Sequence, residues 1–154
     1  MALITLLTDY GYRDPYVAAL KARIFSINNW TSYANRCETH KNNLRGMIEK
    51  CKNDGENIII YGASGKGQSL IQMSGITKDL ISGVVDKSKM KQGKLTPGSH
   101  IKIYPTEYIY ESKANVILLC AWNIAKEIVS QEKRFVELGG KFLLPFPEPH
   151  FYNK

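Results

Sequence analysis

The segment IIIYGASGKGQSL at residues 58–70 decides the fold. It begins with a continuous apolar run, which is typical of a strand buried on both faces of a parallel sheet. Gly62, Gly65 and Gly67 follow at once and lead into an apolar pattern with helical spacing. The segment therefore predicts a strand, a tight turn and a helix whose N-terminus can receive a phosphate group.

Strand-like and helix-like runs alternate on both sides of this segment, a pattern that predicts a parallel sheet covered by helices. We expect strands at residues 3–7, 57–61, 81–85, 101–104, 116–120 and 141–144. We expect helices at residues 15–28, at 33–53, from within the glycine-rich loop, and from about 123 to 138. The fold class that follows is α/β, with a Rossmann-like, doubly wound, mainly parallel sheet in three layers.

Two stretches are expected to lie outside these elements. Residues 30–32 are the least patterned part of the first third, and we interpret them as a junction. The tail at residues 145–149 carries three prolines, which lack the backbone N–H group that a sheet requires. The sheet is therefore expected to end at residue 144.

Length and composition limit the classes of protein to consider. The chain has 154 residues, of which 44% are hydrophobic, enough for one core and too few residues for two well-formed domains. We expect a single α/β domain over residues 1–154, made of a βα unit at 1–30 and a larger region at 31–154. No run approaches the ~20 apolar residues of a membrane span, and Asp9 comes too early for a signal peptide. We therefore expect a cytoplasmic protein without a membrane partner.

Charge and cysteine usage give two further expectations. The 21 basic and 14 acidic residues give a formal net charge of +7, but the basic residues are spread along the chain, which argues against a nucleic-acid partner. The three cysteines, Cys37, Cys51 and Cys120, have none of the paired spacings that hold zinc, so no metal site is expected.

The glycine-rich loop fits neither of two well-known phosphate-binding motifs. Gln68 stands where a P-loop requires lysine, so ATP hydrolysis is not expected. The glycines fall as G-x-x-G-x-G, which differs from the dinucleotide fingerprint. Ser64, Lys66 and Ser69 nevertheless add donors and a positive charge, and Asp86 ends the next strand about 20 residues on, where an acid can accept ribose hydroxyls. The alternative is a merely tight turn with a capping aspartate.

Further candidate ligand contacts follow two strands at the edge where open parallel sheets bind ligands. Lys91, Thr96 and His100 belong to a lysine-rich turn that can neutralise a pyrophosphate, or that is a solvated loop. Asn123 follows the strand at 116–120 and either contacts the ligand or caps a helix. His100 fits no nucleophile–base order, so the catalytic residues stay unknown.

Four collinear motifs carry a family resemblance: YGASGKGQSL at 61–70, VVDKSKMKQGKLTPGSHIKI at 84–103, LLCAWNIAKEI at 118–128 and FVELGGKFLLPFPEP at 135–149. Over about residues 34–150 the chain resembles the C-terminal domain of SAM-dependent sugar C-methyltransferases. The resemblance implies a nucleotide-diphosphate sugar as ligand, held by the glycine-rich loop, Asp86 and the turn at 91–100. It also implies SAM as the family's cofactor, although none is assigned to this chain. The family's zinc module, SAM-binding domain and catalytic stretch are missing, so we expect no methyl transfer without a separate methyltransferase chain.

Residues 1–28 are similar to the opening βα unit of the SAM hydroxide adenosyltransferase (SAM hydrolase) and halogenase family. The motif TDYG places Asp9 at the aspartate that binds adenosine ribose in that family, or makes it a turn residue, which we favour; Tyr10 replaces the usual Phe. The chain thus joins parts of two families, as a natural recombinant or an engineered chimera. Two alternatives to a nucleotide-sugar module follow: a SAM-degrading enzyme that uses the N-terminal segment, and a ligand-free scaffold.

Overall fold

The computed structural model describes residues 30–152. The strand predicted at 3–7, the helix predicted at 15–28 and Asp9 lie outside the described residues. The chain divides into two compact units, Met1–Cys37 and Glu38–Lys154, and the second contains the sheet. Its first element is the C-terminal part of helix α2, Trp30–Asn53. This helix begins earlier than predicted and includes residues 30–32, so the expectation that this stretch lies outside the helices and strands was wrong.

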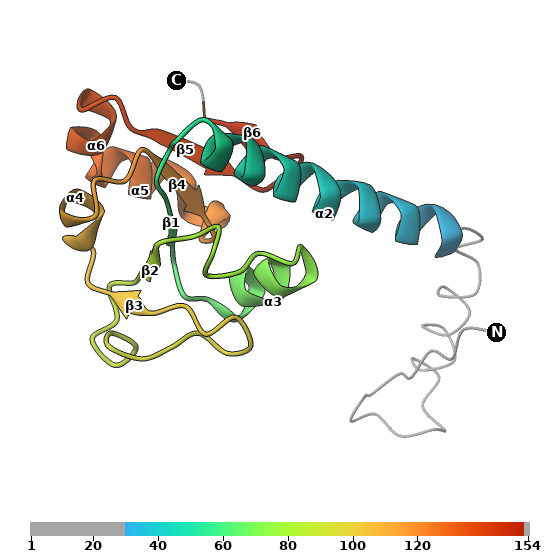
Figure 1. Cartoon of the computed structure of the whole chain (residues 1–154), viewed down its shortest axis with the longest axis horizontal. Helices are drawn as coiled ribbons and strands as arrows, with labels where there is room; N and C mark the ends of the chain where they lie inside the picture. Colours follow the sequence, from blue (N-terminus) through green and yellow to red (C-terminus); the bar gives the residue numbers. More distant parts are fainter. Residues whose placement is uncertain (1–29, 153–154) are drawn as a thin grey trace, which may run out of the picture. The chain divides into compact units, whose positions relative to one another are not determined.

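A six-stranded sheet forms the centre of this unit (Figure 1). Its strands are β1 (Ile58–Tyr61), β2 (Gly83–Val85), β3 (Ile103–Tyr104), β4 (Val116–Leu119), β5 (Lys141–Leu144) and β6 (His150–Phe151). They lie in the order β3-β2-β1-β4-β5-β6, and all neighbours are parallel except β5 and β6. The chain runs outward from β1 to β3 and then returns to β4, so the strand order reverses between β1 and β4. The predicted doubly wound, mainly parallel sheet is confirmed.

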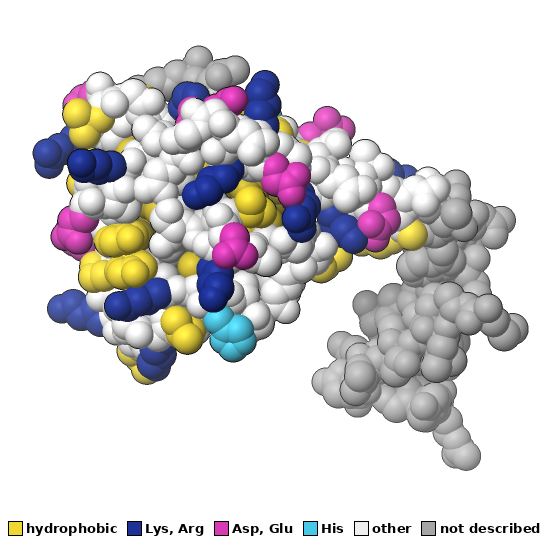
Figure 2. Space-filling model, in the orientation of Figure 1, with side chains coloured by type: hydrophobic (Ala, Val, Ile, Leu, Met, Phe, Trp, Pro, Cys, Tyr) yellow, Lys and Arg dark blue, Asp and Glu magenta, His cyan; other side chains and the backbone are white. Residues whose placement is uncertain are grey.

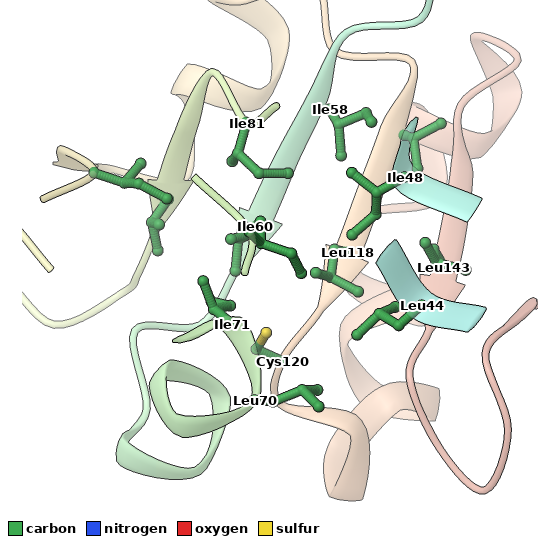
Figure 3. Packing of buried hydrophobic residues seen from close by; sticks show 14 of the residues in the cluster. Leu44, Ile48, Ile58, Ile60, Leu70, Ile71, Ile81, Leu118, Cys120 and Leu143 are labelled. Atoms are coloured by element: carbon green, nitrogen blue, oxygen red, sulfur yellow. The ribbon is translucent and has the colours of Figure 1, made fainter. Parts of the chain in front are cut away.

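Helices cover both faces of the sheet because successive strand residues point to opposite sides. The helices after α2 are α3 (Gly65–Met73), α4 (Tyr108–Glu111), the 3-10 turn η1 (Trp122–Ile124), α5 (Ala125–Gln131) and α6 (Lys133–Glu137). Ile58 and Ile60 pack with α2 and α3 on one face (Figure 3), whereas Ile59 and Tyr61 pack with α4, α5 and α6 on the other. Each fully buried apolar side chain contributes about 1.5–3 kcal/mol. The three predicted layers are therefore present.

Two helical predictions need correction. The helix expected at 123–138 is interrupted at Glu132, whose φ of −97° and ψ of 37° leave the helical range. The Glu132 carboxylate accepts a hydrogen bond from the Tyr110 hydroxyl at 3.0 Å, and the next turn brings Phe135 edge-on against Phe142 with ring centroids 5.3 Å apart. Helix α4 was not predicted, because a single turn is too short to show helical periodicity.

The sheet does not end at residue 144, as the prolines suggested. The proline-containing segment instead reverses the chain, and β6 returns antiparallel to β5, with Leu143 opposite Phe151 and Leu144 opposite His150. The Tyr152 N–H group donates to the Phe142 carbonyl at 2.8 Å. The prolines exclude only their own positions from the ladder, and the residues after them keep their donors. Among residues 30–152, no helix is long and apolar enough to cross a membrane.

Candidate functional site

The glycine-rich loop lies where the carboxyl ends of β1 and β4 meet, at the reversal of strand order, which is where ligands bind to open α/β sheets. Gly62 adopts a φ of 99°, a conformation that favours glycine. Its N–H group donates to the Val85 carbonyl at 2.8 Å, and a Cβ there would lie 3.3 Å from the Cβ of Ala121. Gly62 therefore turns the chain sharply while the loop stays close to β2 and β4.

The other two glycines of the loop serve different purposes. A Cβ on Gly67 would lie 2.6 Å from the Cβ of Cys120, so glycine lets α3 approach the end of β4 closely. A Cβ on Gly65 would meet nothing within 4 Å, and this residue is exposed at the start of α3. A turn, an open backbone and a close helix–strand contact are the three tasks of the dinucleotide-fingerprint glycines. The loop therefore provides these tasks with a different spacing.

Ser64 caps helix α3. Its backbone is extended, with φ −90° and ψ 153°, and its Oγ accepts a hydrogen bond from the Gly67 N–H group at 3.1 Å. In the described part of the chain no acceptor is bound to the N–H groups of Gly65 and Lys66, two of the donors that a helix start leaves open. Lys66 is exposed beside them. Ser69 lies one turn further on, where its hydroxyl donates to the Gly65 carbonyl at 3.1 Å.

Asp86 is located beside the loop, as predicted, but its carboxylate binds the protein's own donors. Oδ2 accepts the Ala63 N–H group at 2.8 Å and the Lys91 ammonium at 3.1 Å, and Oδ1 accepts the Ser88 N–H group at 2.8 Å. Burial raises the pKa of Asp86, but the hydrogen bonds from Ser88, Lys91 and Ala63 together with the Lys91 charge outweigh it and hold the pKa below its ordinary value. The carboxylate is therefore ionised at neutral pH and holds the glycine-rich loop against the end of β2.

Of the three residues predicted in the turn at 91–100, Lys91 reaches this place. Lys91 contacts the loop through the Ala63 carbonyl at 3.0 Å. Thr96 is buried, and its Oγ1 bonds internally to the Ser99 hydroxyl at 2.7 Å and to the Ile101 N–H group at 2.9 Å. His100 is exposed, with a φ of 52°. Lys91 therefore lies at the loop, whereas the Thr96 hydroxyl forms hydrogen bonds within the turn.

The segment after β4 packs against the other side of the loop. Asn123 lies in η1, and α5 has no side-chain cap, so Asn123 does not cap that helix. The Trp122 ring packs against Phe146 with centroids 4.8 Å apart, and Phe146 stacks on His40 at 4.6 Å. The Nε2 atom of His40 is buried and has no hydrogen-bond partner among the described residues.

His40 and Phe146 were not among the predicted site residues, because they stand far apart in the chain and nothing in the motif at 135–149 points to His40. The sequence also indicated no structural role for Gln68. Gln68 is buried, with its Oε1 accepting from the Ser99 hydroxyl at 3.4 Å. Its Nε2 atom has no partner in the part of the chain that the structure describes.

Cys37, Cys51 and Cys120 are free thiols, and the last two are buried. Burial raises the pKa of Cys120 to about 12, so it stays a neutral thiol packed against Gly67. The described residues contain no group of three or more histidine, cysteine or acidic side chains that could hold a metal ion. On the face drawn in Figure 2, basic side chains are interspersed with acidic and apolar ones.

Comparisons with known proteins agree with the motifs. A family model described as C-methyltransferase C-terminal domain matches residues 18–147. The match therefore begins earlier than the resemblance predicted from the motifs, which started at about residue 34. C-methyltransferase NovU of Streptomyces niveus is 37% identical over 120 residues, which cover 78% of this chain and 29% of that protein. The chain thus spans about three-tenths of the length of this curated relative. A solved structure, UDP-D-quinovosamine 4-dehydrogenase from Vibrio fischeri, is similar with a TM-score of 0.43 and 23% identity, over 58% of this chain and 76% of that one.

Proposed function

Because this chain belongs to the family of C-methyltransferase C-terminal domains, we propose that it is the nucleotide-sugar-binding module of a SAM-dependent sugar C-methyltransferase. In this proposal the glycine-rich loop holds the diphosphate of the ligand. The reacting sugar then extends toward a SAM-binding part that supplies the methyl group. Binding and orientation of the sugar nucleotide is the contribution of this chain.

The observation that carries the proposal is the open start of α3. Gly65 leaves the backbone accessible, and the N–H groups of Gly65 and Lys66 are not bound to acceptors in the described region. A helix N-terminus carries a partial positive charge of about half a unit, which favours phosphate. Lys66 adds an exposed positive charge beside these donors, and the Lys91 ammonium, paired with Asp86, lies against the loop at Ala63. A diphosphate matches this combination of fixed donors and nearby cations.

The proposal is tested by titrating the 15N-labelled chain with UDP, dTDP and their hexose derivatives. We expect the amide resonances of Gly65, Lys66 and Gly67 to shift, because phosphate oxygens would bind in front of them. Gly65→Ala should weaken binding at least tenfold, since a methyl group would occupy the approach of the phosphate. Gly46→Ala is the matched control, because Gly46 is an exposed glycine of α2 whose Cβ would also meet nothing within 4 Å.

Two outcomes would contradict the proposal. Millimolar nucleoside diphosphates could leave the loop resonances unmoved, or Gly65→Ala could bind as tightly as Gly46→Ala. A shift caused by SAM, with none caused by nucleoside diphosphates, would indicate the SAM-degrading alternative instead.

A further inference from the structure

The end of β2 and the glycine-rich loop are joined by a compact set of contacts around one carboxylate. Asp86 receives the backbone N–H groups of Ala63 and Ser88, each at 2.8 Å. Lys91 completes the set by bonding to both Asp86, at 3.1 Å, and the Ala63 carbonyl, at 3.0 Å. Ala63 directly precedes Ser64, the cap of α3, so these bonds control where the phosphate-facing helix begins.

These contacts give Asp86 a different task from that of a ribose-binding acid. Three donors already occupy its two oxygens, and two of them belong to the backbone of its own domain. Turning the carboxylate toward a ribose would disturb its bond to the Ala63 N–H group, which is one of the bonds that hold the loop against the end of β2. Asp86 is therefore better suited to hold the loop in place than to bind a nucleoside.

Lys91 is held less firmly than its partners. Its side chain is 44% exposed, whereas the Asp86 side chain is only 12% exposed. Ion pairs whose cation lies near solvent contribute little to stability, so moving the Lys91 ammonium away from Asp86 has a small cost. Asp86 would keep its two backbone donors after such a break, and a phosphate group offers the ammonium a stronger, charge-assisted bond.

We propose that Asp86 is a positioning residue for the glycine-rich loop, and that Lys91 exchanges its bond to Asp86 and Ala63 for a phosphate oxygen when a nucleoside diphosphate binds. The exchange rests on the proposed function, whereas the positioning by Asp86 does not. The Lys91 ammonium thus binds the loop before the ligand arrives and binds the ligand's phosphate afterwards.

The test compares Asp86→Asn, Lys91→Met, Lys91→Arg and Lys94→Met by calorimetric titration with UDP and by amide resonances without ligand. We expect Lys91→Met to weaken UDP binding about tenfold or more, which corresponds to the loss of one hydrogen bond to a charged group. Lys91→Arg should restore most of the affinity, because it keeps the charge. Lys94→Met removes an exposed lysine of the same turn and should change the affinity less than threefold.

Asp86→Asn should shift the Ala63 and Ser88 amide resonances in the absence of any ligand, because both N–H groups lose a charged acceptor. Unmoved Ala63 and Ser88 resonances would overturn the positioning role. UDP binding that is equal in Lys91→Met and Lys94→Met would overturn the exchange while leaving the proposed function intact. Absence of UDP binding to the unmodified chain would instead refute the proposed function and the exchange together, and the Asp86 result would still stand.

Discussion

Gly67 offers the most direct test of the close approach between α3 and β4. A Cβ on residue 67 would lie 2.6 Å from the Cβ of Cys120, 3.2 Å from its Sγ and 3.1 Å from the Ser64 Oγ. Residue 67 and Cys120 are both buried, so neither can move into solvent. Gly67→Ala therefore forces α3 away from the sheet, and overpacking of this kind costs about 1–3 kcal/mol.

A second effect of the substitution acts in the opposite direction. Alanine favours a helix over glycine by about 0.5–1 kcal/mol. The net loss in the free energy of unfolding is then about 1 kcal/mol, within a range of roughly 0–2.5 kcal/mol. For a chain of this length, each kcal/mol lowers Tm by about 2–4 °C, so we expect a decrease of roughly 2–4 °C and at most about 10 °C.

The assay is urea and thermal unfolding followed by circular dichroism. Gly46→Ala is the control, because this exposed glycine of α2 reports the helix preference without a steric clash. It should raise stability by about 0.5–1 kcal/mol. A Gly67→Ala variant as stable as Gly46→Ala would show that α3 does not approach Cys120 this closely, and would refute the steric role of Gly67.

Three further predictions concern the cap, the core and pH. Ser64→Ala should lower the free energy of unfolding by about 1 kcal/mol in urea unfolding, because the Gly67 N–H group loses its acceptor; an unchanged midpoint would contradict the cap. Leu44→Ala should lower the free energy of unfolding by about 2–5 kcal/mol in the same assay, because Leu44 is a residue of α2 that is fully buried against the sheet. A decrease typical of a surface site, under about 0.5 kcal/mol, would mean that α2 does not pack there. The pKa of Asp86 is lowered in the folded chain, so ionisation of this carboxyl stabilises the fold. The stabilisation is complete above the ordinary pKa of about 4, and it is lost as pH falls through the lower pKa of the folded chain. The stability difference between the unmodified chain and Asp86→Asn should therefore shrink when unfolding is measured at decreasing pH below about 5, and a difference that grows instead would reverse the sign assigned here.

Local pattern was enough to predict the centre of the fold. β1 and α3 could be predicted because an apolar run, three glycines and a helical pattern follow each other within a dozen positions. β6 could not, because the prolines before it predict a strand end, and the return of the chain depends on a partner edge at β5. The break in the helix at Glu132 could not be predicted either, because Tyr110, whose hydroxyl bonds to the Glu132 carboxylate, belongs to another element.

The candidate site divides in the same way. The place of Gly62, Gly65 and Gly67 was predictable from the strand before them and the helix after them. The spacing of Asp86 predicted that it ends a strand near the loop, but not which donors would face its carboxylate. The stacking of Phe146 on His40 joins residues more than a hundred positions apart, and no local signal in either segment predicts such a contact.

The close contact of the loop with the segment after β4 has a consequence for how this domain can evolve. Gly62 packs against Ala121 and Gly67 packs against Cys120, so the size of each loop residue limits the size of the residue that it contacts after β4. A larger residue at position 67 would be tolerated only after Cys120 had become smaller, whereas the φ of 99° at Gly62 disfavours any side chain there, whatever residue replaces Ala121. In natural variants of this chain the two segments should therefore change together, and a recombination that exchanged one without the other would yield poorly folding offspring.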